Sequence, residues 1–111
     1  MAINKKDHFS KAENELASFS KALAHPARVA ILKEIARRGG DCICGEIVDV
    51  MPLAQATVSQ HLKELLKAGL ITGTVDGARS CYAMNKNAFV RFERAFRILY
   101  EKSLSSDCCN L

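Results

Sequence analysis

The chain has 111 residues, the length of a single domain that buries only about two thirds of its unfolded surface and often leaves apolar surface for a partner. Its 16 basic and 12 acidic residues give a net charge of +4, which is compatible with binding a polyanion but does not establish it. Residues 1–15 carry charges throughout and no apolar run, so we expect neither a signal peptide nor a membrane span, and a cytoplasmic protein.

Two helices are predicted in the first third of the chain. Residues 9–23 place apolar side chains roughly at helical spacing, with charged residues between them, which predicts an amphipathic helix. Pro26 ends this helix and is favoured in the first turn of the next, which we expect over Ala27–Arg38. Its last turn carries two arginines near the negative end of the helix dipole, and the glycine pair 39–40 terminates it.

Two further helices are predicted in the middle of the chain. The third is short, roughly Ile43–Val50, with Asp41 as a cap. A turn that contains Pro52 separates it from a fourth helix within residues 53–68, which shows one apolar and several polar faces. Gly69 stands in the left-handed position expected after that helix.

A hairpin and a final helix complete the pattern. Residues 70–84 place β-branched and aromatic residues on both sides of Asp76-Gly77, a strong hairpin signal. The final helix lies within residues 87–103, and an aromatic and aliphatic stripe recurs along it at intervals of three and four residues: Phe89, Phe92, Phe96 and Leu99. This stripe predicts a dimer interface with the first helix, or alternatively only a core contact.

The order ααααββα is that of a winged helix-turn-helix, a mainly α fold with a small β-hairpin wing (α+β). We therefore expect residues 1–104 to form one DNA-binding and dimerisation domain, followed by a flexible tail, residues 105–111, that carries Cys108 and Cys109.

Polar side chains on the fourth helix are the candidates for contacting DNA. They are short or amide-bearing donors and acceptors near a helix start, the chemistry that reaches base edges and phosphates in a major groove. The candidates are Gln55, Thr57, Ser59, Gln60, His61 and Lys63. At the hairpin tip, Arg79 is placed to contact the adjacent minor groove or phosphates.

Five cysteines are an odd number, and in a reducing cytosol they indicate free thiols, metal ligands or redox sensors rather than a disulfide framework. Cys42 and Cys44 are two residues apart, so on an ideal helix they would point about 200° apart. Either they are two small apolar residues, or something binds both and bends the backbone.

Three stretches resemble the ArsR/SmtB family of bacterial winged-helix repressors: "KALAHPARVAIL", "ATVSQHLKELLKAGLI" and "TGTVDGARSCYAMN". The resemblance covers roughly residues 16–100. It implies a homodimeric repressor, not an enzyme and without a catalytic cofactor, that binds double-stranded operator DNA and leaves it when an inducer binds. Where the family usually caps the recognition helix with Ser, Thr or Asp, this chain has Ala54.

The resemblance also implies an inducer site, because the family's arsenic and cadmium sensors open the third helix with Cys-x-Cys. Arsenite or another soft metal(loid) ion would bind Cys42 and Cys44 and distort the first turn of that helix. Some relatives keep a further cysteine where this chain has Ile47, so the candidates for a third sulfur are Cys108 and Cys109 in the tail. The family's Asp and His site on the last helix has no match here, so zinc, nickel or cobalt is not expected there.

Several alternatives remain open. The thiols could instead form a redox-sensing disulfide, although nearby carboxylates disfavour a thiolate. A small thiol oxidoreductase is the alternative from another class, but the sequence has no C-x-x-C pair. An inducer-blind DNA-binding module is a third. Cys81 is expected in the core, and the histidines at positions 8, 25 and 61 as surface or capping residues.

Overall fold

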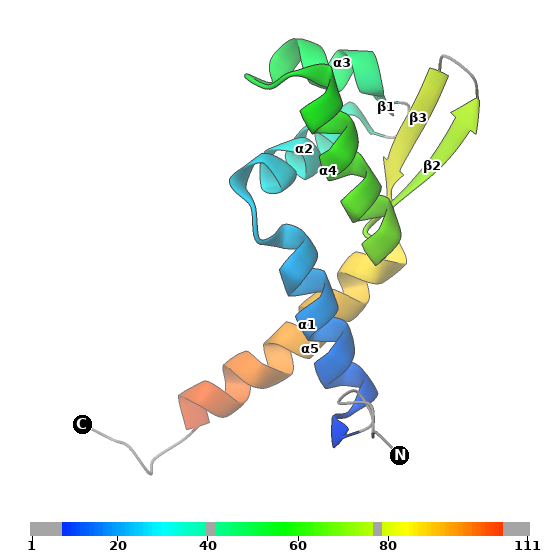
Figure 1. Cartoon of the computed structure of the whole chain (residues 1–111). Helices are drawn as coiled ribbons and strands as arrows, with labels where there is room; N and C mark the ends of the chain where they lie inside the picture. Colours follow the sequence, from blue (N-terminus) through cyan, green and yellow to red (C-terminus); the bar gives the residue numbers. More distant parts are fainter. Residues whose placement is uncertain (1–7, 40–41, 77–78, 106–111) are drawn as a thin grey trace.

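A computed structural model describes residues 8–39, 42–76 and 79–105, without the side chains of residues 42, 43, 75, 76 and 79 (Figure 1). In chain order the elements are α1 (Lys11–Leu23), α2 (Pro26–Arg38), β1 (Cys42–Ile43), α3 (Cys44–Val50), α4 (Gln55–Ala68), β2 (Ile71–Asp76), β3 (Arg79–Met84) and α5 (Lys86–Ser105). Among these ranges, no helix is long and apolar enough to cross a membrane.

The predicted winged helix-turn-helix is confirmed, with each helix and both wing strands in the expected order. The sequence missed one element, the two-residue strand β1 directly before α3. Helix α5 reaches Ser105, one residue past the expected domain boundary, and the rest of the predicted tail lies outside the described residues.

Local sequence signals set the helix ends. Ser10 and Glu13 form a capping box at the start of α1. His25 caps α2 through Nδ1, which accepts from the Ala27 N–H at 3.1 Å, and Pro26 occupies the first helical position. Gly39 and Gly69 end α2 and α4 with φ of 72° and 82°, the left-handed conformation that glycine adopts without strain.

The sheet has the order β1-β3-β2, and both pairings are antiparallel. In the wing, Asp76 pairs with Arg79, so the turn falls where Asp76-Gly77 predicted it. On the other side of β3, Cys42 pairs with Tyr82 and Ile43 with Cys81. The sheet therefore anchors the backbone at Cys42 beside the base of the wing.

The core joins α2, α3, α4 and the base of the wing. Its largest fully buried side chains are Ile31, Ile35, Ile47, Val58, Leu62, Leu65, Leu70 and Ile71. Ile47 comes from α3 and is 0% exposed, so α3 contributes to the same core as the recognition helix α4. A displacement of α3 would therefore disturb the packing around α4.

Helices α1 and α5 cross one another below the rest of the domain (Figure 1). The predicted apolar stripe of α5 divides in two: Phe89 and Phe92 pack against the core, whereas Phe96 and Leu99 are 50% and 54% exposed. The interpretation of the whole stripe as core is therefore wrong for its C-terminal half. That half is the spare apolar surface expected of a small domain.

Candidate DNA interface and thiol site

The exposed face of α4 carries four of the six predicted DNA contacts from this helix: Gln55, Thr57, Gln60 and Lys63. The Gln60 amide lies 3.5 Å from Glu64 Oε1, a weak contact that leaves the amide free to turn to a base edge. This side of α4 is chemically suited to a major groove.

The N-terminal end of α4 lacks a side-chain cap, as the sequence predicted. Ala54 occupies the cap position in an extended conformation and makes no side-chain hydrogen bond. Its carbonyl accepts from the N–H groups of Thr57 and Val58 at 3.1 and 3.0 Å. Helix geometry leaves the N–H groups of Gln55 and Ala56, the first two residues of α4, without an intrahelical acceptor, and these suit an anion such as a DNA phosphate.

His61 and Ser59 do not belong to the exposed face. His61 is only 8% exposed, which corrects the expectation that it lies on the polar surface of α4. Ser59 is half-buried and faces α3. The reason is helical spacing, because His61 follows Val58 by three residues and precedes Leu65 by four, which places it on the apolar stripe.

Arg28 fixes His61 in that position. Its Nε donates to His61 Nδ1 at 3.1 Å, and its Nη1 donates to the Ala22 carbonyl at 3.2 Å, so one guanidinium joins α1, α2 and α4. The rings of His25 and His61 lie 4.6 Å apart. Burial, followed by the electrostatic effects of His25 and Arg28, lowers the pKa of His61. The sequence pattern did not indicate this tie between α2 and the recognition helix.

At the wing, the structure describes the backbone of Arg79, which begins β3 opposite Asp76. Its side chain lies outside the described part, so its predicted contact with DNA stays a prediction.

The two cysteines of the Cys-x-Cys motif lie at a junction between strand and helix. Cys42 is in β1, and Cys44 is the first residue of α3. The helix therefore begins one residue later than the predicted Ile43, because Cys42 and Ile43 both pair with β3. Cys44 is half-buried, and its Sγ lies 3.9 Å from Ser59 Oγ on α4. The thiol thus touches the recognition helix directly.

Within the part of the chain that is described, the structure does not identify a third sulfur for the motif. Ile47 stands fully buried where some relatives keep a cysteine, and Cys81 lies in register with Ile43 rather than with Cys42. No group of three His, Cys, Asp or Glu side chains in the described residues is arranged to hold a metal ion. Cys108 and Cys109 lie outside those residues, as do the side chain of Cys42 and the predicted cap Asp41.

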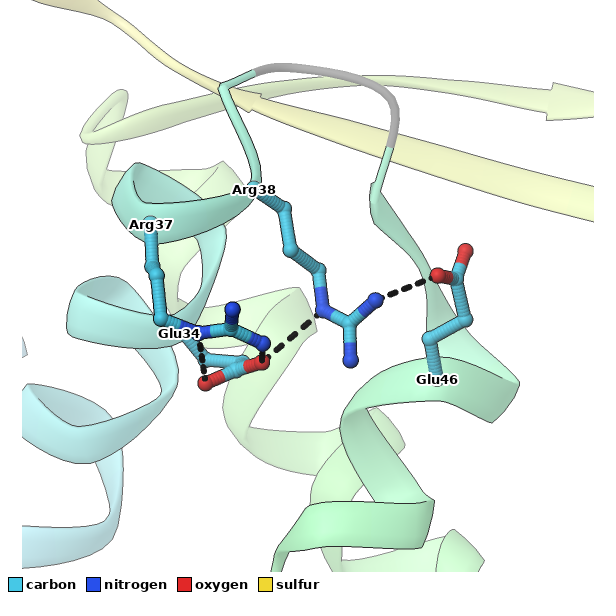
Figure 2. A network of polar contacts seen from close by, with 4 residues as sticks. All are labelled: Glu34, Arg37, Arg38 and Glu46. Carbon is cyan, nitrogen blue, oxygen red and sulfur yellow. Dashed lines mark hydrogen bonds and ion pairs between the residues drawn. The ribbon is translucent and has the colours of Figure 1, made fainter.

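A charged network joins α2 to α3 beside this motif (Figure 2). Arg38 donates through Nε to Glu34 at 2.8 Å and through Nη1 to Glu46 at 2.5 Å. Arg37 also donates to Glu34, through Nε at 3.2 Å and Nη2 at 2.5 Å. Hydrogen bonding from Arg37, against a smaller opposing effect of burial, lowers the pKa of Glu34, and Arg38 adds to the lowering.

Comparison with known proteins places this geometry in a family. Residues 23–74 match the family described as "Helix-turn-helix domain". The arsenical resistance operon repressor of Bacillus subtilis is 35% identical over 92 residues, covering 80% of this chain and 85% of that protein.

Solved structures share the fold. An ArsR family transcriptional regulator superposes with a TM-score of 0.75 at 23% identity, covering 88% of this chain and 99% of the other. A homodimeric winged helix-turn-helix DNA-binding domain from Mycobacterium bovis gives a TM-score of 0.64 at 23% identity, covering 94% of each chain. With the recognition helix, the wing and the relationship to the Bacillus repressor established, the chain belongs to the ArsR/SmtB family of DNA-binding transcriptional regulators, which are not enzymes.

Proposed function

We propose that this protein is a homodimeric repressor that leaves its operator when arsenite or a related soft metal(loid) binds Cys42 and Cys44. The observation that carries the proposal is the 3.9 Å contact between Cys44 Sγ and Ser59 Oγ. It connects a candidate inducer ligand to the helix that reads DNA. The name of the Bacillus relative, an arsenical resistance operon repressor, favours arsenic among the soft ions.

Arsenite would bind by forming bonds from arsenic to the cysteine sulfurs. Each thiol that replaces a hydroxyl group of arsenite forms an As–S bond and releases one water molecule, and thiolate sulfur is the ligand that soft ions prefer. A bond from Cys44 to arsenic draws its sulfur away from Ser59 and strains the first turn of α3. The inducer then favours the DNA-free conformation because it binds that conformation more tightly.

A third sulfur would come from the tail of the partner protomer. The C-terminal end of α5 lies at the opposite end of the molecule from α3 (Figure 1). From Ser105, the three residues to Cys108 span at most about 11 Å. A tail cysteine is therefore better placed to reach the α3 of a second chain than its own.

The dimer would form through α1 and α5. The exposed half of the α5 stripe adjoins a groove of about 420 Å³ between the two helices, lined by Leu16 and Ala17 of α1 and by Ala95, Ile98 and Leu99 of α5. A second copy would cover this apolar surface. Its two recognition helices would enter major grooves about 34 Å apart, so the operator should be an imperfect inverted repeat.

The test is release of a fluorescent operator duplex during titration with arsenite. Cys42→Ser and Cys44→Ser should bind the operator like the wild type and fail to release it, while the control Cys81→Ser should release normally. If either variant released the operator at the arsenite concentration that suffices for wild type, Cys42 and Cys44 would not be the inducer site. Operator binding that no thiol ligand alters would indicate an inducer-blind module.

The third sulfur has its own test, in which residues 105–111 are removed. Methylarsenite has one bond already occupied by carbon and needs only two thiolates. Truncation should therefore weaken arsenite binding much more than methylarsenite binding. Equal weakening of both would remove Cys108 and Cys109 from the site.

A further inference from the structure

Arg38 spans the thiol motif by bonding to a carboxylate on each side of it (Figure 2). On one side it holds Glu34 of α2 at 2.8 Å, and on the other it holds Glu46 of α3 at 2.5 Å. Between Arg38 and Glu46 the chain passes through Cys42 and Cys44. The ion pair thus closes a short loop whose inner residues include both proposed inducer ligands.

The α2 end of this bridge is firmly placed. The side chain of Glu34 is 14% exposed and is also held by Arg37, while that of Arg38 is 23% exposed. The α3 end is more accessible to solvent, because the Glu46 side chain is 39% exposed. Stretching the bridge therefore displaces Glu46, and with it the first turn of α3.

Glu46 follows Cys44 by two residues and lies in that first turn. We propose that Arg38 is a positioning residue that holds α3 in its DNA-binding position and so sets how much inducer is needed for release. This inference rests on the proposed function. Binding of the inducer must move the turn that the Arg38–Glu46 pair restrains, so part of the binding free energy is used to break or stretch that pair.

A purely electrostatic role for the same residues makes a different prediction. A nearby arginine stabilises a thiolate, and a nearby glutamate destabilises it. If only the field mattered, loss of Arg38 would raise the inducer concentration needed for release, and loss of Glu46 would lower it. If the restraint matters, both losses lower it.

The experiment compares arsenite-driven operator release in wild type, Arg38→Met, Glu46→Gln and the double variant. Each single variant should need about two- to fivefold less arsenite, the factor expected of a partly exposed ion pair. The double variant should need no less than the single variants, since both remove the same contact. Arg37→Met is the matched control, because it removes an arginine from Glu34 and leaves the Arg38–Glu46 pair in place, and its release should match wild type. Arg38→Lys should recover part of the effect.

The inference would be overturned if Arg38→Met and Glu46→Gln shifted the arsenite concentration needed for release in opposite directions. It would also be overturned if Arg37→Met shifted that concentration as much as Arg38→Met does.

Hydrogen exchange of the inducer-free protein separates this inference from the proposed function. Amides of residues 45–50 should exchange faster in Arg38→Met than in wild type or Arg37→Met. Unchanged exchange would refute the restraint even if arsenite releases the wild type, whereas a wild type that arsenite does not release would refute the proposed function alone.

Discussion

The two ends of α2 are tied to their neighbours by arginines in different ways. At its N-terminal end, Arg28 donates to a buried imidazole and to a carbonyl, and it holds the recognition helix α4. At its C-terminal end, Arg38 makes ion pairs that solvent partly reaches, and it holds α3. Loss of the first tie leaves buried acceptors without a donor, whereas the second is screened by water. The contrast suits a regulator in which α3 moves more readily than the recognition helix, so that an inducer acts on α3 first.

Removing each arginine in turn tests whether the two ties differ in strength. Arg28→Met should lower the free energy of unfolding by about 1–3 kcal/mol, because His61 Nδ1 and the Ala22 carbonyl lose their donor. Arg38→Met should cost less than about 1 kcal/mol. Urea denaturation at one fixed protein concentration measures both values, and equal costs would mean that the two ties do not differ in kind.

A second prediction compares two lysines of α4. Lys63 lies on the exposed face proposed to meet DNA, whereas Lys67 lies in the last turn and lines a different groove with Lys21 and His25. Lys63→Ala should reduce the slope of log affinity against log salt concentration by about 1, the value for one phosphate contact. Lys67→Ala should leave the slope unchanged. The reverse result would move the proposed DNA-binding surface toward the C-terminal end of the helix.

The smallest expected effect is a dependence of stability on pH through His61. Its pKa in the folded protein lies below the ordinary value of 6.5. As the pH falls below 6.5, the unfolded chain therefore takes up a proton that the folded chain does not, and stability decreases.

His61→Gln keeps an acceptor for Arg28 and removes the titration. The difference in unfolding free energy between wild type and this variant should be largest at pH 7.5 and shrink toward pH 5. Parallel curves over that range would show that the His61 environment does not favour the neutral ring.

Much of the fold could be predicted because its signals are local. Pro26, Gly39 and Gly69 mark helix ends by their own backbone preferences, and Asp76-Gly77 marks the turn. Strand β1 could not be predicted in this way. It has only two residues, and its pairing depends on β3, which lies about forty positions further along the chain.

The candidate site was predicted less completely, for reasons that differ by residue. Helical spacing from Val58 and Leu65 was enough to place His61 inside, but its polarity suggested the surface. Arg38 was attributed to the helix dipole, whereas its partners are the carboxylates of Glu34 and Glu46. The second partner is on another element, so sequence position alone could not reveal it.

The most direct test of release through α3 is hydrogen exchange of the operator-free protein with and without arsenite, in wild type and in Cys44→Ser. Arsenite should accelerate exchange of the amides in residues 45–50 of the wild type, leave the buried stretch of α4 around Leu62 and Leu65 protected, and change nothing in Cys44→Ser. If arsenite releases the operator while exchange in α3 of the wild type stays the same, the inducer does not act through α3, and the proposed route of release is wrong.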